Sequence, residues 1–190
     1  EQTLHFKQVF ATLKRMGYPQ VEKCYHLPYA LVMLPEGKMS SRAGNVILFS
    51  KLRDEIIENI QSAHLNEQKN EWTRKELDET SQKIAIAAIK YGMLNQDSNK
   101  KIIFSLKDWL ISEGDTGTYL VYAYVRIRSI VRQVSKKISI DVDYSLLTHE
   151  NEKKLLRQLL DFNIIVLNSG EQYRPSMLAR MLYELSKDFN

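Results

Sequence analysis

One stretch of the sequence decides the fold: from Gly114 to Ile130 it reads GDTGTYLVYAYVRIRSI. Two glycines punctuate its start, and neither glycine nor proline interrupts residues 118–137, so we expect a long helix from about Thr118 to Lys137. At about 100° per residue, one side of this helix is apolar. That side carries Leu120, Ala123, Ile127, Ile130, Val131, Val134 and Ile138. The helix therefore has a face to bury against other elements.

A second side of the same helix is basic. It carries Arg128, Arg132 and Lys136. Cations in such a row can contact the phosphates of an RNA, although a basic helix face is more often only solvated. Two interpretations are also open for the tyrosines of this helix, Tyr119, Tyr122 and Tyr124. They can be core or boundary residues, or they can be platforms on which bases stack. Arg126 lies closer to the apolar side and is expected to pair within the protein.

Helical patterns extend from about residue 51 almost to the end of the chain. Ser50 is a plausible N-cap for the first of these helices. Thr73 and Glu76 have the spacing of a capping box, and the helix after them carries the small residues Ala87 and Ala88, which allow a close helical neighbour. Further helices are expected over residues 150–160, near 164–168 and over 176–189, the last preceded by Pro175.

Residues 1–50 have a different pattern. They predict a helix over 2–16, a buried strand region over 25–34 that Pro28 interrupts, a polar loop over 38–45 and a short strand over 46–49. We therefore expect a mainly α protein with two domains: a small α/β part over 1–50 and a helical bundle over 51–190.

Bulk properties narrow the class of protein. The chain has 190 residues and a net charge of +4, which permits a polyanionic partner without requiring one. No apolar run approaches the length that crosses a bilayer, and residues 1–7 lack the apolar stretch of a signal peptide. Cys24 is the single cysteine, and no Cys/His cluster has zinc spacing, so we expect no metal site and a reducing, cytoplasmic setting. The chain does not begin with methionine, and we expect it to be part of a longer protein.

The segment that carries chemistry is residues 34–45, LPEGKMSSRAGN. Such a basic, hydroxyl-rich loop can bring backbone amides, Lys38 and Arg42 against phosphate oxygens and stabilise a departing pyrophosphate. Most polar, glycine-flanked loops are only surface turns, and that alternative stays open on chemistry alone. Glu36 has no partner carboxylate for acid–base work. His5 and His26 are interpreted as structural.

Residues 38–42, KMSSR, resemble the KMSKS motif of class I aminoacyl-tRNA synthetases, with Ser41 in place of the second lysine and Arg42 in place of the final serine. The flanking residues 34–37 and 44–46, the stretch 114–130 and the end 174–190 resemble the arginyl-tRNA synthetase family in particular. The resemblance implies that Lys38 is catalytic. It also implies a loop that binds ATP phosphates, formed by Gly37, Lys38, Met39, Ser40, Ser41 and Arg42.

The resemblance carries further expectations. Residues 1–50 would be the end of a class I catalytic domain, and 51–190 most of a helical anticodon-binding domain of the DALR type. The parent protein would be a monomeric arginine–tRNA ligase that uses ATP, Mg²⁺, arginine and arginine tRNA, with no bound metal or prosthetic group in this part and Arg128, Arg132 and Lys136 facing RNA. This part alone would be inactive, because the half of the site that contains the HIGH motif is missing. A standalone, non-catalytic tRNA-binding module and a purely structural helical scaffold are the alternatives.

Overall fold

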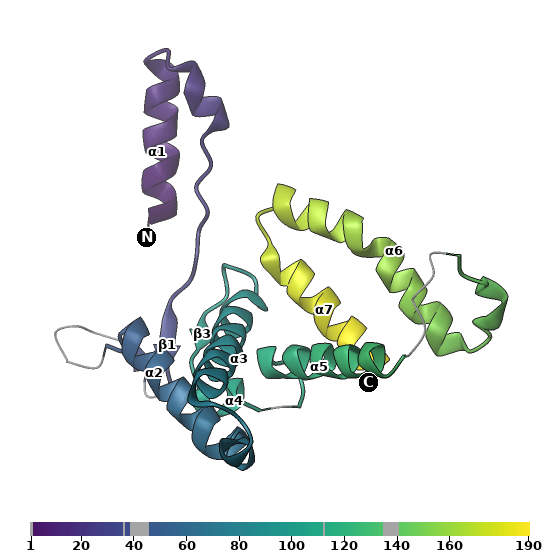
Figure 1. Ribbon diagram of the computed structural model, residues 1–190. Coiled ribbons are helices and arrows are strands. Elements are labelled where there is room, and N and C mark those ends of the chain that lie inside the picture. Colours follow the sequence, from purple (N-terminus) through teal and green to yellow (C-terminus); the bar gives the residue numbers. More distant parts are fainter. Residues whose placement is uncertain (1, 36, 39–45, 112, 135–140) are drawn as a thin grey trace.

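The computed structural model describes residues 2–35, 37–38, 46–111, 113–134 and 141–190 (Figure 1). The helices are α1 (Gln2–Arg15), α2 (Phe49–Asn59), α3 (Arg74–Leu94), α4 (Leu106–Trp109), α5 (Gly117–Gln133), α6 (Glu150–Glu171) and α7 (Pro175–Phe189). The strands are β1 (Val32–Leu34), β2 (Gly37–Lys38) and β3 (Ile102–Ile103). Short 3₁₀ turns cover Pro19–Lys23, Glu67–Asn70 and Tyr144–Leu146, and a π-helical turn, Ile60–His64, extends α2. The mainly α class predicted from the sequence is confirmed.

The elements are arranged around α3 (Figure 1). On one side of it lie α2, α4 and the small sheet, and on the other lie α5, α6 and α7. Helix α1 and the turn after it stand apart from the rest, and an extended segment, residues 24–31, joins them to β1. Helices α6 and α7 form a hairpin whose connecting turn lies beside this extended segment.

The sheet is smaller than the sequence predicts. Its strand order is β2-β1-β3, with β1 antiparallel to β2 and parallel to β3. The expected strand region over 25–34 pairs only at Val32–Leu34. Pro28 has no amide hydrogen to contribute to a ladder, and β3 offers only two residues for pairing, so residues 25–31 are extended without being a strand.

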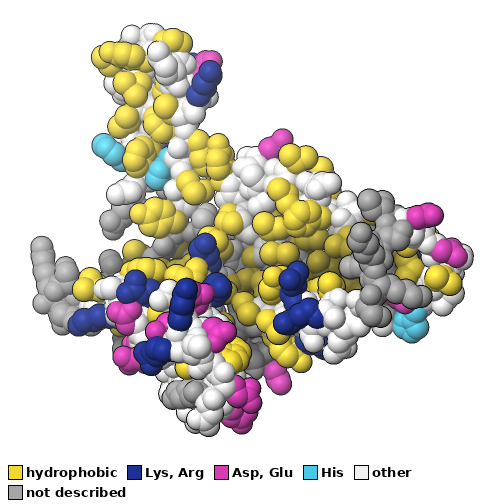
Figure 2. All heavy atoms as spheres, viewed as in Figure 1, with side chains coloured by type: hydrophobic (Ala, Val, Ile, Leu, Met, Phe, Trp, Pro, Cys, Tyr) yellow, Lys and Arg dark blue, Asp and Glu magenta, His cyan; other side chains and the backbone are white. Residues whose placement is uncertain are grey.

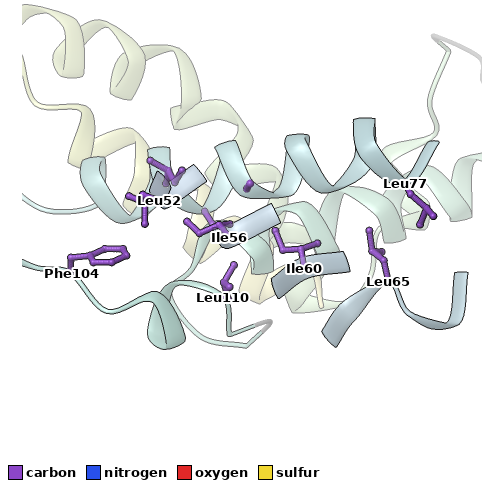
Figure 3. Close-up of a cluster of buried hydrophobic side chains, with 10 residues drawn as sticks. Leu52, Ile56, Ile60, Leu65, Leu77, Phe104 and Leu110 are labelled. Atoms are coloured by element: carbon purple, nitrogen blue, oxygen red, sulfur yellow. The ribbon is translucent and has the colours of Figure 1, made fainter. Parts of the chain in front are cut away.

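The main hydrophobic core joins the sheet to the helices of the first half of the chain (Figure 3). Ile56 and Ile60 are fully buried and pack with Leu52 of α2, Leu77 of α3 and Phe104, which follows β3. Val32 and Leu34 of β1 pack against this cluster. Strand β1, which precedes the predicted phosphate loop, and helices that follow the loop therefore share one core.

Three local expectations are wrong. Residues 46–48 do not form a strand, since none of the described segments pairs with them, and α2 already begins at Phe49. Its N-cap position is Leu48, so Ser50 lies inside the first turn. The helices expected over 150–160 and 164–168 are one helix, α6, because Asn163 lowers helix stability by less than about 1 kcal/mol and no proline or glycine intervenes.

The capping box of Thr73 and Glu76 is confirmed, with Glu76 N donating to Thr73 Oγ1 at 3.3 Å.

Helices α3 and α5 are in close backbone contact at Gly117. A Cβ atom at this position would lie 2.3 Å from the carbonyl oxygen of Ala87. Ala88 and Ala123 are buried at 1% and 2% exposure. The small residues of α3 thus allow the close neighbour that the sequence predicts, and that neighbour is α5.

The apolar side of α5 is buried over only part of its length. The α5 residues that line the apolar cavities between α5 and helices α3, α6 and α7 run from Gly117 to Ile127. Farther along, Ile130, Val131 and Val134 are 40–50% exposed, and Ile127 itself is 41% exposed. The expected burial is therefore confirmed at Ala123, is partial at Leu120 and is wrong for the second half of the helix.

The α3–α5 crossing yields a stability prediction. Gly117→Ala should lower the free energy of unfolding by about 2–3 kcal/mol, because the added methyl group forces two backbones apart. Gly170→Ala is the matched control: Gly170 lies in helix α6 with open space at its Cβ position, and alanine there should be neutral or stabilising by up to about 1 kcal/mol. Urea unfolding of the two variants measures both values, and equal effects would contradict the proposed crossing.

Candidate functional site

The base of the predicted phosphate loop is the strand pair β1–β2. Met33 pairs with Lys38, and Leu34 pairs with Gly37. Gly37 has φ +131, a conformation that side-chain-bearing residues rarely adopt. This backbone requirement explains the glycine ahead of Lys38, since open space surrounds its Cβ position.

Of the predicted loop residues, the structure describes Gly37 and the backbone of Lys38. Met39, Ser40, Ser41 and Arg42 lie outside the described residues, as does the side chain of Lys38. Their roles stay predictions.

Strand β1, the partner of Gly37 and Lys38, is anchored along its other edge by β3. Ile102 N donates to Leu31 O at 3.1 Å, and Phe104 N donates to Met33 O at 2.7 Å. Phe104 is itself buried in the core and packs edge-on against Trp109. The backbone at Lys38 is thus linked to the core through β1, which is the support a cation needs to meet a phosphate in a preorganised position.

The predicted RNA-facing residues lie on α5. Arg128 and Arg132 are exposed one helical turn apart, and Arg132 Nε also donates to Arg128 O at 3.3 Å. Lys136 lies outside the described residues. In Figure 2, basic side chains lie over α5, and others lie over α2 and α3 mixed with acidic ones. Two exposed guanidinium groups at this spacing can contact neighbouring phosphates.

Arg126 pairs within the protein, as its position in the helix predicts. Its Nη1 donates to Asn190 Oδ1 at 2.8 Å, and its guanidinium lies over the Tyr122 ring at 5.7 Å from the centroid. Tyr119 packs against Tyr183 of α7, while Tyr124 is 61% exposed. The three tyrosines of α5 therefore have different surroundings.

A buried tyrosine links α3 to both neighbours on its helical side. The Tyr91 hydroxyl donates to Asp115 Oδ1, just ahead of α5, and lies 3.3 Å from the carbonyl oxygen of Ala179 in α7. Burial, and then the hydrogen bond with Asp115, raise the pKa of Tyr91 above its ordinary value, so the phenol stays protonated and acts as a donor. No sequence signal identified these partners of Tyr91, which lie 24 and 88 residues away.

A charged cluster joins the end of α3 to the start of α7. Arg174 Nη2 donates to both carboxylate oxygens of Asp97, at 2.9 and 3.0 Å, and Ser176 Oγ donates to Asp97 Oδ1 at 2.8 Å. These hydrogen bonds, the one from Arg174 first, lower the pKa of Asp97 below its ordinary value. No sequence signal pointed to this cluster, because Arg174 and Ser176 lie 77 and 79 residues away from Asp97 along the chain.

The described part of the chain supports neither a metal site nor a membrane-spanning helix. Its residues contain no group of three or more His, Cys, Asp or Glu side chains arranged to hold a metal ion. None of its helices combines the length and the apolar composition that a membrane span requires.

Comparison with known proteins places both halves of the chain. The family model described as "tRNA synthetases class I (R), catalytic domain" matches residues 1–106, and the one described as "DALR anticodon binding domain" matches residues 120–190. The division near residue 50 that the sequence suggested stays a prediction.

Curated relatives and solved structures agree with these matches. The chain is 38% identical to the arginine–tRNA ligase of Bdellovibrio bacteriovorus and 37% identical to that of Clostridium acetobutylicum, in each case over its whole length and 33% of the relative. The arginyl-tRNA synthetase structure from Thermus thermophilus aligns with a TM-score of 0.82 at 30% identity, covering 96% of this chain and 29% of that one. The Plasmodium falciparum enzyme aligns at 0.78 and 25%, covering 99% and 32%.

The strand-anchored loop base, followed by a helical bundle that matches an anticodon-binding domain, defines a class I aminoacyl-tRNA synthetase. Within that class the chain belongs to the arginyl family, the tRNA synthetases class I (R). It spans about a third of the length of the curated relatives that it matches.

The Asp97 cluster yields a pH prediction. The folded-state pKa of Asp97 is depressed, so its contribution to stability is present above the ordinary value of 3.8 and is lost as pH falls through the folded-state pKa. Asp97→Asn should therefore destabilise the protein at neutral pH, and the difference from the wild type should shrink below about pH 4. Urea unfolding of both proteins between pH 3 and pH 7 measures this, and a pH-independent difference would contradict the prediction.

Proposed function

We propose that this chain forms the phosphate-loop and anticodon-domain part of an arginine–tRNA ligase. The full-length protein would use ATP with Mg²⁺ to activate arginine as arginyl-adenylate. It would then transfer arginine to the terminal adenosine of arginine tRNA. The observation that supports this best is the order of the matches on one chain: the catalytic-domain match runs through Lys38, and the anticodon-domain match follows it.

In this proposal Lys38 is the catalytic residue of the chain. Attack of the arginine carboxylate on the α-phosphate releases pyrophosphate, and negative charge accumulates on the departing oxygens. A lysine held at the end of an anchored strand can stabilise that charge without moving far in the transition state. Gly37, Met39, Ser40, Ser41 and Arg42 would complete the loop, with Arg42 supplying positive charge where the motif has Ser41 in place of its second lysine.

The helical half would bind the tRNA. Arg128 and Arg132 are the described members of the basic row on α5, and Lys136 would extend it. Contacts of this kind hold the phosphate backbone in register and carry no base specificity. We propose further that the full-length protein is monomeric and cytoplasmic, and that this chain alone does not activate arginine, because it spans only about a third of its relatives.

The first test is Lys38→Ala in the full-length protein. The wild type should attach arginine to tRNA and catalyse arginine-dependent exchange of pyrophosphate into ATP. The kcat of the variant should be roughly 10²- to 10³-fold below that of the wild type, which is the usual loss when one preorganised charge-stabilising group is removed. Lys83→Ala, at an exposed position of α3, is the control and should stay within about twofold of wild type. A wild-type protein that attaches a different amino acid would overturn the proposed function.

The second test addresses the RNA-facing row. Arg128→Ala and Arg132→Ala should each raise the KM for arginine tRNA and reduce the slope of log KM against log salt by about 1, since each removes about one phosphate contact. The KM for ATP should not change. Arg74→Ala is the control, because that exposed guanidinium pairs with Asp78 on its own helix. Unchanged salt slopes for both α5 variants would show that this face is only solvated.

A further inference from the structure

The turn between α6 and α7, residues 172–174, touches the catalytic-domain half of the chain at two points. Tyr173 stacks on Tyr25 with ring centroids 4.5 Å apart and an interplanar angle of 16°. Arg174, the next residue, forms the two-oxygen contact with Asp97. Both partners lie within residues 1–106, whereas the turn lies within residues 120–190. The turn is thus a contact between the two matched domains.

The backbone of the turn is shaped for this contact. Tyr173 has φ +53, the one positive φ among the described non-glycine residues. Glycine would adopt this conformation without steric conflict, and a tyrosine there keeps a strained backbone. The residue is 51% exposed, so burial in a core does not account for the tyrosine. What the tyrosine side chain adds over glycine is the stack on Tyr25.

Tyr25 lies on the extended segment that leads to the phosphate loop. This segment, residues 24–31, continues directly into β1, and β1 pairs with β2 at Gly37 and Lys38. Before β1 it is extended without being part of a strand ladder among the described residues. A ring stacked on Tyr25 therefore limits where the segment can lie.

The second contact, Arg174 with Asp97, lies ahead of β3, the strand next to β1. Asp97 belongs to the turn that leads from α3 to β3, and β3 is the parallel partner of β1. The two segments ahead of these strands are also joined, since Ala30 N donates to Ser98 O at 2.7 Å. The α6–α7 turn, the extended segment and the turn at Asp97 therefore form a closed ring of contacts at the start of β1 and β3 (Figure 1).

We propose that the α6–α7 turn is a positioning element for the phosphate loop: through Tyr173 on Tyr25 and Arg174 on Asp97, the anticodon domain holds the strands that carry Lys38. This rests on the proposed function, because it assigns Lys38 to ATP. Tyr25, Tyr173 and Asp97 act through the strands and touch no substrate. Loss of the ring of contacts loosens β1 and β2 and weakens the grip on ATP more than the grip on tRNA.

The test uses kinetics and amide hydrogen exchange on the full-length protein. Tyr25→Ala and Tyr173→Ala should each lower kcat/KM for ATP roughly threefold to tenfold, the equilibrium factors that correspond to one aromatic stack. The double variant should be no worse than either single one, because both remove the same contact. Exchange should accelerate at residues 32–34 and stay slow in α3, and Asp97→Asn should show the same pattern. The KM for tRNA should stay within about twofold.

Conservative variants separate positioning from general loss of structure. Tyr25→Phe and Tyr173→Phe keep the stack and should behave as wild type. Tyr29→Ala, at a ring that is 81% exposed on the same segment, should also behave as wild type. Additive losses in the double variant, or a raised KM for tRNA with ATP kinetics unchanged, would overturn the proposal. A wild-type protein without arginine attachment would overturn the proposed function instead, and the exchange at residues 32–34 would still test the contact.

Discussion

The rest of the structure depends on the close approach of α3 and α5 at Gly117. Helix α3 buries Leu77, Ala85 and Ile89 in the core that contains the strands. At Ala87 and Ala88 its backbone and small side chains receive the start of α5. One helix therefore belongs to both halves of the chain. Because a single methyl group at Gly117 does not fit, the distance between these halves is set by backbone contact, which leaves little room for adjustment.

Polar contacts then set the orientation that apolar packing leaves free. Burial of apolar surface is non-directional, so small residues at a crossing fix a distance more firmly than an angle. Tyr91 bonds to Asp115 and meets the Ala179 carbonyl, and Asp97 bonds to Arg174 and Ser176. The two groups lie on or just beyond the last two turns of α3, and both reach α7. They give the helical hairpin α6–α7 a defined position relative to the strands.

This arrangement separates the two sites that the sequence predicts, the phosphate loop and the RNA-facing row of α5. The strand pair that ends at Lys38 lies on one side of α3, and the basic row of α5 lies on the other. In the function proposed above, chemistry at a phosphate and contact with RNA occur at separate places on a shared support. The α6–α7 turn returns to the strands from the side on which α5 lies, and its contacts with Tyr25 and Asp97 connect the two halves.

Local sequence determined much of this protein. The capping box at Thr73, the start of α7 at Pro175, the start of α5, the mainly α class and the family resemblance could all be predicted, because short-range propensity and motif order carry them. The end of α5 could not, since the helix stops at Gln133 and not at Lys137. For the candidate site, the sequence predicted Lys38 and the basic row, and those roles stay predictions, whereas Gly37 is explained by its own φ angle.

Tertiary structure decided the features that depend on distant partners. Residues 25–31 and 46–48 have the composition of strands, but no described segment pairs with them in a ladder. On the apolar side of α5, Ala123 is buried whereas Ile130 and Val134 are exposed. The partners of Tyr91, Asp97 and Tyr25 lie between 24 and 148 residues away, at separations where no periodicity or spacing rule applies. A single sequence encodes such contacts only through the fold that brings them together.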